Sequence, residues 1–240
     1  MSAVKGDELH SPHDHLEIAQ LLADTGRTDE AIDWARRGLE RYAHRWHQTP
    51  KLRDWLAELL ERHGQRDEVT ALYWDGFVRH PTLGTYRQLV DHATHPSHAS
   101  AEAIAHVQDR VGTPLGGAGH RYPADPLIEI LDHEGRHEEA WTLYREHGCD
   151  HDLAMRLAKR RETEHPMDAI TIYERDVERN IERKNKTGYR AAVRQLSTIR
   201  ELAGRAGRPE VATRIIERIR TEHRQKRNLM SLLDDAGPGV

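Results

Sequence analysis

The sequence predicts an all-α protein, a right-handed stack of about six antiparallel helix hairpins. Two observations favour this fold class. A turn motif of glycine, two polar residues, two acidic residues and a small residue recurs along the chain. After the clear copies, small and apolar residues return every three or four positions, which is the spacing of one face of an α-helix. The repeated unit is therefore a turn with a helix on either side.

Three clear copies of the motif set the length of the repeat: GRTDEA at 26–31, GQRDEV at 64–69 and GRHEEA at 135–140. They are separated by 38 and then 71 residues, and the second interval is close to two units of about 35 residues. Three weaker copies complete the series: SHASAEA at 97–103, EHPMDA at 164–169 and GRPEVA at 207–212.

Each part of the motif has a physical reason. Glycine suits the left-handed backbone conformation that closes a helix. The acidic residues that follow stabilise the positive N-terminal end of the next helix. We therefore expect Asp29 and Glu30 to stabilise a helix start rather than to perform acid–base chemistry.

Small residues in the second helix of a hairpin are expected to let the two helices approach closely. In the first unit one helical face carries Ala31, Ala35, Gly38 and Tyr42. The second unit repeats the pattern and ends before a proline, with Val69, Tyr73, Gly76 and Pro81.

These positions resemble the tetratricopeptide repeat (TPR), a helical hairpin of about 34 residues. The best matches are Ala57, Val69, Tyr73, Gly76 and Pro81. Longer segments resemble the helical C-terminal region of SWIM zinc-finger family proteins of bacteria, especially actinobacteria: GRTDEAIDWARRGLERY, HPTLGTYRQLV, EEAWTLYREHGC, GYRAAVRQLSTIRELA and EHRQKRNLMSLLDDAG. The resemblance covers about 14 to 236 and implies a TPR-like right-handed α-solenoid that mediates contacts.

The chain departs from that family in one respect. A SWIM zinc finger needs three cysteines and a histidine, whereas this chain has one cysteine, Cys149. The zinc-binding, nucleic-acid-linked module is therefore missing, and its functions are not carried over. A single cysteine also excludes an internal disulfide framework and fits a reducing cytoplasm.

Four segments are predicted along the chain: a flexible N-terminal segment at 1–13, helical repeats at 14–111, a Gly-rich connector at 112–123, and further repeats with a basic capping helix at 124–236. No apolar stretch approaches the roughly 18 residues that span a bilayer, and the first residues lack the apolar core of a signal peptide. We expect a cytoplasmic protein with no membrane association.

The charge is distributed unevenly. The net charge is −4 overall, −10 over residues 1–150 and +6 over residues 151–240. Such polarity favours oriented association, either head to tail between copies of the chain or with a charged partner.

In stacked helical hairpins, the first helices of successive units line the concave surface where a partner binds. Arginines in these helices are candidates for holding the carboxylates of a peptide: Arg53, Arg87, Arg156, Arg190 and Arg194. The pairs Tyr86-Arg87 and Tyr189-Arg190 repeat one another. For each arginine the alternative is an exposed side chain paired with a nearby acidic residue.

Histidine is the most unusual part of the composition, because 15 of the 18 histidines precede residue 151. The tightest cluster is His10, His13 and His15, with Asp14 and Glu17 nearby. Histidine and carboxylate together suit zinc, nickel, manganese or iron. The alternative is that these histidines are structural or exposed to solvent.

Two further histidine groups favour structural roles. In the group His92, His95 and His98, Pro96 interrupts the helical spacing that shared ligands need. Cys149 lies between two histidines in EHGCDHD, which resembles an activated thiolate, but no oxyanion-binding element accompanies it.

The basic stretch at 214–227 is predicted as a capping helix that buries Ile215, Ile216 and Ile219 and turns its charges outward. Contact with a nucleic-acid backbone is the alternative, which the acidic residues of the stretch and of the whole chain disfavour.

The predicted function is a non-catalytic adaptor or scaffold that binds a protein or peptide on its concave face and needs no cofactor. The alternative is a His-rich metal-dependent protein or an enzyme accessory to a biosynthetic pathway. A nucleic-acid-associated accessory protein is the third hypothesis.

Overall fold

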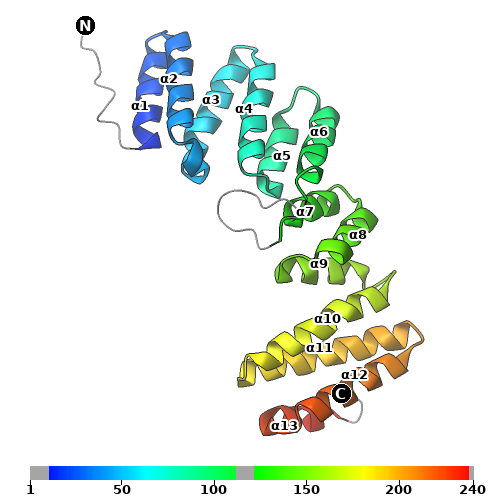
Figure 1. The fold of residues 1–240 in the computed structure, drawn as a ribbon. Helices are drawn as coiled ribbons and strands as arrows, with labels where there is room; N and C mark the ends of the chain where they lie inside the picture. The colour runs from blue at the N-terminus through cyan, green and yellow to red at the C-terminus, as the bar shows by residue number, and fades with distance from the viewer. Residues whose placement is uncertain (1–10, 112–121, 238–240) are drawn as a thin grey trace. The chain divides into compact units, whose positions relative to one another are not determined.

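The computed structural model describes residues 11–111 and 122–237, except the side chains of residues 46 and 47. These residues form thirteen α-helices and one short 3-10 helix, with no strand among them (Figure 1). The predicted all-α class is confirmed. No helix in the described ranges is long and apolar enough to cross a membrane.

The chain divides into two compact units, and the first comprises Met1–Gly119 with Pro126–Arg136. Its helices are α1 (Pro12–Asp24), α2 (Thr28–Arg41), η1 (Ala43–Gln48), α3 (Pro50–Arg62), α4 (Arg66–Arg79), α5 (Leu83–His92), α6 (Pro96–Gln108) and nearly all of α7 (Asp125–His133). From α1 to α6, each α-helix packs against the next α-helix along the chain. Although α7 follows the predicted connector at 112–123, it groups with the helices that precede that segment.

The second unit comprises His120–Asp125 and His137–Val240. Its helices are α8 (His137–His147), α9 (His151–Arg161), α10 (Pro166–Glu182), α11 (Lys186–Arg205), α12 (Pro209–Glu222) and α13 (Arg227–Asp235). Helix α10 packs against α9 and α11, and α11 also packs against α12 and α13. The predicted capping helix at 214–227 is thus interrupted by a turn after Glu222.

Five of the six predicted motifs span a turn and the start of the next helix, which is α2, α4, α8, α10 or α12. The weaker copy SHASAEA at 97–103 is wrong as a turn, because it lies inside α6, which starts earlier, at Pro96. Gly26, Gly64, Gly135 and Gly207 have φ of 76°, 74°, 77° and 69°. A Cβ at these positions would meet no atom within 4 Å, so conformation rather than space requires glycine.

Two helix starts differ in detail from expectation. The acidic pair of GRTDEA lies in the first turn of α2, but no side chain caps that helix. Glu30 instead accepts a hydrogen bond from Arg27, with 2.7 Å between Arg27 Nε and Glu30 Oε1. Helix α1 begins at Pro12 with Ser11 and Asp14 as a reciprocal capping box, so the end of the segment predicted as flexible at 1–13 is helical.

Close helix approach explains the small residues of the first hairpin. Ala31 and Ala35 are fully buried in α2. A Cβ on Gly38 would lie 2.8 Å from the Cβ of His15 and 2.9 Å from a methyl carbon of Leu52. Glycine at this position therefore lets α2 pack directly against α1 and α3, as predicted.

Candidate functional site

The structure places Arg53 in the core instead of on a partner-binding surface. Its exposed fraction is 3%. The guanidinium lies 6.0 Å from the centre of the Tyr73 ring, and its Nε is 3.6 Å from the Asp54 carboxylate. Burial lowers the pKa of Arg53. This side chain packs α3 against α4 and is not available to a partner, so its place among the candidates is corrected.

The other candidate arginines are exposed at helix surfaces: Arg87 on α5, Arg156 on α9, and Arg190 and Arg194 on α11. In both repeated dipeptides the tyrosine is buried and the arginine exposed, with Tyr86 at 1% and Tyr189 at 8% exposure. The guanidinium groups of Arg87, Arg190 and Arg194 form no hydrogen bond or ion pair with any residue that the structure describes. Their charges are therefore free to meet a ligand.

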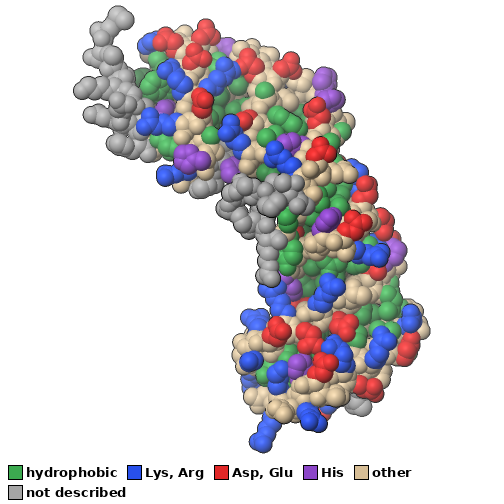
Figure 2. All heavy atoms as spheres, in the orientation of Figure 1, with side chains coloured by type: hydrophobic (Ala, Val, Ile, Leu, Met, Phe, Trp, Pro, Cys, Tyr) green, Lys and Arg blue, Asp and Glu red, His purple; other side chains and the backbone are tan. Residues whose placement is uncertain are grey.

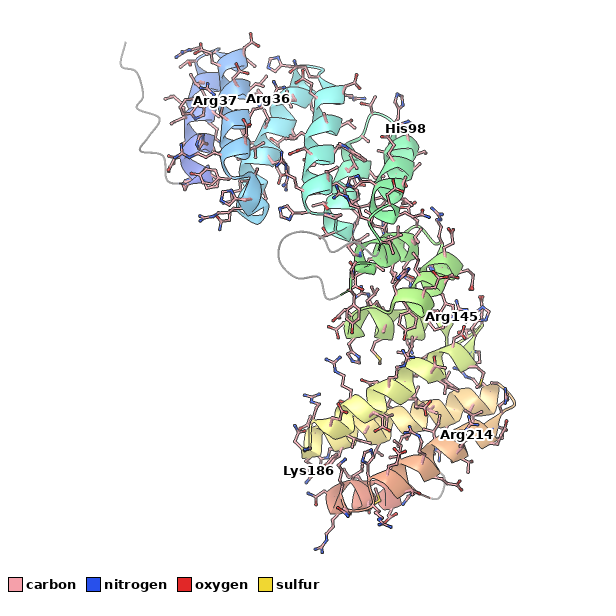
Figure 3. The ribbon with its side chains drawn as sticks, viewed as in Figure 1. Arg36, Arg37, His98, Arg145, Lys186 and Arg214 are labelled. Atoms are coloured by element: carbon pink, nitrogen blue, oxygen red, sulfur yellow. The ribbon has the colours of Figure 1, made fainter. Side chains whose placement is uncertain are left out.

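Some arginines of the second unit are paired with carboxylates, among them Arg161 and Arg218. The side chain of Arg161 is 9% exposed and holds Glu138 and Asp168, each at 2.8 Å. Figure 2 shows acidic and basic side chains interspersed over α10 to α13. Exposed arginines that form no ion pair within the described ranges occur on second helices as well, including Arg145 on α8 and Arg214 on α12 (Figure 3). Exposure alone therefore does not define a site.

Two of the three histidines predicted to bind metal, His13 and His15, lie in α1 but in different environments. His13 is exposed, and its Nε2 lies 3.3 Å from Glu17. His15 is 5% exposed, with its ring 5.6 Å from Trp34 and 5.9 Å from Tyr42 between ring centres. Burial, with a smaller contribution from Arg41, lowers the pKa of His15. His10 lies outside the described residues.

The histidines near Pro96 also have separate partners. His92 ends α5, stacks on Tyr73 with ring centres 4.5 Å apart, and lies 3.1 Å from Glu61. His98 lies in α6 and faces Glu102 at 3.3 Å (Figure 3). As expected, the helical spacing is interrupted, because α5 ends at His92; the structure adds that Pro96 starts α6.

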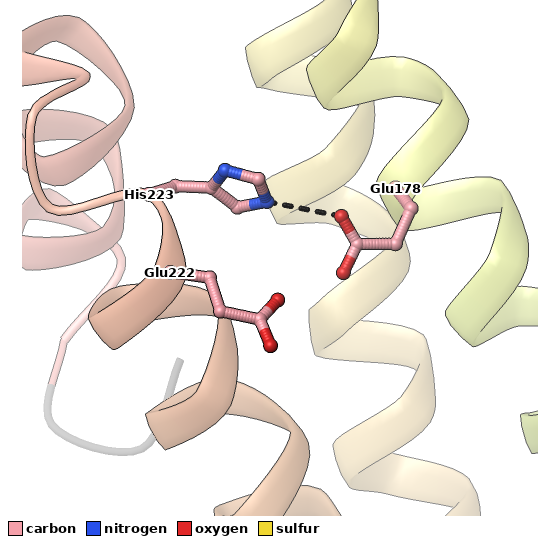
Figure 4. Close-up of side chains that lie close together, drawn as sticks. All are labelled: Glu178, Glu222 and His223. Carbon is pink, nitrogen blue, oxygen red and sulfur yellow. Dashed lines mark hydrogen bonds and ion pairs between the residues drawn. The ribbon is translucent and has the colours of Figure 1, made fainter.

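Sequence reasoning missed the one group of three potential metal ligands that the described residues bring within 4.8 Å of each other: Glu178, Glu222 and His223 (Figure 4). Glu178 accepts from His223 Nε2 at 2.9 Å. Lys226 Nζ lies 2.7 Å from His223 Nδ1, and because an ammonium only donates, Nε2 carries the imidazole proton. No signal in the sequence joins residues of α10 and α12 that are more than forty positions apart.

Arg218 forms ion pairs with both carboxylates of this group. Its guanidinium nitrogens lie 2.8 Å from Glu178, 3.0 Å from Glu222 and 3.1 Å from Glu174. Two cationic side chains therefore already bind the groups that a divalent ion would need, and their charges oppose its approach. The arrangement is that of an ion-pair network that joins α10 to α12.

Cys149, the cysteine that lies between two histidines in the sequence, has a buried side chain. Its Sγ donates to the carbonyl oxygen of Asp150 at 3.3 Å. The neighbouring histidines face carboxylates, His147 towards Glu146 and His151 towards Asp176.

No protein-family model matches the chain, and no curated protein sequence matches it. The resemblance to TPR and SWIM-family helical regions therefore stays a prediction.

Proposed function

We propose that this protein is a non-catalytic adaptor built from TPR-like hairpins, which binds an acidic segment of a protein partner. The observation that carries the proposal is the pair Arg190 and Arg194 on α11. Both side chains are exposed and have no partner among the described residues, although most of the buried or half-buried arginines nearby are held by carboxylates.

The spacing of this pair suits an extended peptide. Residues four apart in a helix are separated by about 6 Å along its axis. Alternate side chains of an extended strand are separated by about 6.6 Å and point to the same side. Two acidic residues separated by one other residue would therefore face Arg190 and Arg194 together.

Arg87 on α5 supports the same function in the first unit. Like Arg190 it follows a buried tyrosine, and its side chain is exposed without a partner in the described chain. A TPR-like arrangement would place both α5 and α11 among the partner-facing first helices. The single buried cysteine fits our proposal that the adaptor acts in a reducing compartment.

The alternative, a metal-dependent protein, has less support from the geometry. His15 packs in the core, and the Glu178 group is held by Arg218 and Lys226. A nucleic-acid partner would also use exposed arginines, but binding to phosphates would weaken steeply with salt and show no preference for acidic peptides.

The test is affinity capture from native lysate with tagged wild-type protein and with the Arg87→Glu/Arg190→Glu variant, followed by mass spectrometry. Elemental analysis is performed on untagged protein in parallel. We expect a stoichiometric protein partner that the variant loses, without stoichiometric metal. Stoichiometric metal with no captured protein would refute the adaptor, and nuclease-sensitive capture would favour the nucleic-acid hypothesis.

A further inference from the structure

The second unit contains an open cavity of about 490 Å³ that the adaptor function does not use. It lies between the turn that joins α8 to α9 and the exposed side of α10. Its size is within the range of small-molecule and peptide-residue pockets, about 300 to 1,000 Å³.

Two guanidinium groups line this cavity without a carboxylate partner. Arg175 Nη1 donates to the hydroxyl oxygen of Tyr144 at 3.1 Å, which leaves its charge uncompensated. The side chain of Arg179, one turn further along α10, forms no hydrogen bond or ion pair with any described residue. The two arginines thus offer several N–H donors and two positive charges to an occupant.

Asp150, which lines the cavity, and Asp176, which follows Arg175 in α10, have partners of their own. Asp176 is mostly buried and lies 3.2 Å from His151 Nε2. Asp150 caps α9 by accepting from the backbone N–H of Asp152 at 2.9 Å. The N–H of Asp150 in turn donates to the Asp125 carboxylate at 3.2 Å. An anion that enters the cavity would therefore meet Arg175 and Arg179 without displacing an internal ion pair.

The remaining lining includes Asp150 and His151 and is apolar in part. Ile172 and Ala154 form the apolar part, beside the buried thiol of Cys149 and the ring of Tyr144. Burial raises the pKa of Tyr144, so its hydroxyl stays protonated at neutral pH and can donate to an anion while it accepts from Arg175. An occupant with one anionic end and a small apolar body would satisfy both the arginines and this apolar part.

The start of α9 favours a carboxylate over a phosphate as the occupant of the cavity. Phosphate sites commonly use free N–H groups at a helix N-terminus. Here Asp150 caps the start of α9, and Asp152 adds a second negative charge in its first turn. These carboxylates repel a dianion about twice as strongly as a monoanion at the same distance, so the start of α9 favours a monoanion held by the α10 arginines.

We propose that this cavity binds a carboxylate attached to a small aliphatic group. Two sources carry this chemistry: the C-terminal residue of a peptide, and a free short-chain carboxylic acid. The site uses none of the residues assigned to partner binding on α5 and α11, so it stands or fails independently of the adaptor function.

Isothermal titration calorimetry with two pairs of probes tests the proposal. One pair is 4-methylpentanoate and its neutral amide. The other is an acetylated pentapeptide, GGGGL, with a free or an amidated C-terminus. We expect at least one carboxylate to bind and its amide to bind about tenfold more weakly or not at all, because a charge-assisted hydrogen bond is lost. If 4-methylpentanoate binds more tightly, the ligand is a free carboxylic acid. If the peptide with a free C-terminus binds more tightly, the ligand is the C-terminal residue of a peptide.

The Arg175→Gln/Arg179→Gln variant should weaken binding of the carboxylate by about tenfold or more. The matched control Arg145→Gln/Arg214→Gln removes the same charge from exposed positions that do not line the cavity. It should leave the affinity within about twofold, as expected for solvent-exposed charges screened by salt. Arg179→Gln alone removes no hydrogen bond or ion pair of the described chain, so weaker binding by this variant would not result from misfolding. No binding of either carboxylate, equal binding of the amides, or unchanged affinity in the double variant would overturn the proposal.

Discussion

The first unit packs histidines against aromatic rings, whereas the second unit joins its helices through arginine and carboxylate groups. Four histidines of the first unit lie within 6.5 Å of a ring centre: His15, His92, His106 and His133. In the second unit, Arg161 and Arg218 each hold two or more carboxylates. Packing thus accounts for part of the histidine excess in the N-terminal half of the chain.

The difference predicts how each unit responds to its solution conditions. Burial lowers the pKa of His15 and of His106, so the first unit should lose stability in acid. Ion pairs at partly exposed sites weaken with salt, so the second unit should lose stability at high ionic strength. Steric contacts between packed helices depend on neither pH nor ionic strength. Substitutions that disturb these contacts should change the stability most.

The largest effect is expected at a helix crossing of the second unit. A Cβ on Gly188 of α11 would overlap the backbone carbonyl oxygen of Asn180 in α10. Because backbone cannot move aside easily, Gly188→Ala should lower the free energy of unfolding by about 3 kcal/mol. Gly204 lies in the same helix, and a methyl group there would have no atom within 4 Å. Gly204→Ala should instead stabilise by about 0.5 kcal/mol in chemical denaturation, and equal effects of the two changes would contradict this reasoning.

The corresponding crossing of the first unit should be more tolerant. A methyl group on Gly38 would lie 2.8 Å from Cβ and Cγ of His15 and 2.9 Å from a methyl carbon of Leu52, contacts that are longer than the one to a backbone oxygen at Gly188. Gly38→Ala should cost about 1.5 kcal/mol. In a double-mutant cycle with His15→Ala, part of that cost should disappear, because the contact with the ring carbon Cγ is removed while the contact with Cβ remains. Strict additivity of the two changes would show that the ring does not set the crossing.

The turns and the core of the first unit show which parts of the fold the sequence could predict. The turn glycines and helix starts follow from local backbone chemistry, so Gly26 and Gly64 identified the hairpins without knowledge of their packing. Burial of Arg53 was missed although the sequence contained a signal. Leu56 and Leu60 follow it by three and seven positions on the same helical stripe, and both are buried.

The candidate sites depend on contacts between helices, which no local pattern encodes. Arg175 and Arg179 come together with Tyr144 only because α10 packs beside the turn that precedes α9. The network around Arg218 likewise joins residues forty or more positions apart. The sequence identified Arg190 and Arg194 through the repeat, and their lack of acidic partners in the described chain became visible only in the fold.

The ion-pair network should contribute a smaller amount. Arg218→Ala removes the cation shared by Glu174, Glu178 and Glu222. Because the side chain is 37% exposed, we expect a loss of about 1 kcal/mol at low salt that shrinks in about 1 M sodium chloride. Arg208→Ala removes an isolated exposed pair with Glu210 and should have almost no effect. A loss that is independent of salt would indicate packing by the arginine stem instead.

The smallest effect is the response of the first unit to acid. The pKa of His15 is lowered in the folded state, so the unfolded chain binds more protons below its ordinary pKa of 6.5. Stability is therefore highest above that pH and falls as the pH drops from 6.5 towards the folded value. The loss for one histidine between pH 7 and pH 5.5 is at most about 1 kcal/mol. In the His15→Leu variant, the midpoint temperature of thermal denaturation should change less between pH 7 and pH 5.5 than in the wild-type protein. An equal pH dependence in the two proteins would exclude His15 as the cause of the acid sensitivity.

The central claim is that unpaired arginines on α11 bind an acidic partner, and one comparison tests it most directly. Capture of the partner by wild-type protein is compared with capture by Arg190→Glu/Arg194→Glu and by Arg145→Glu/Arg214→Glu, which reverse the same number of exposed charges within one unit. We predict that the α11 variant loses the partner while the variant on α8 and α12 retains it. Equal retention, or equal loss, would contradict recognition by Arg190 and Arg194.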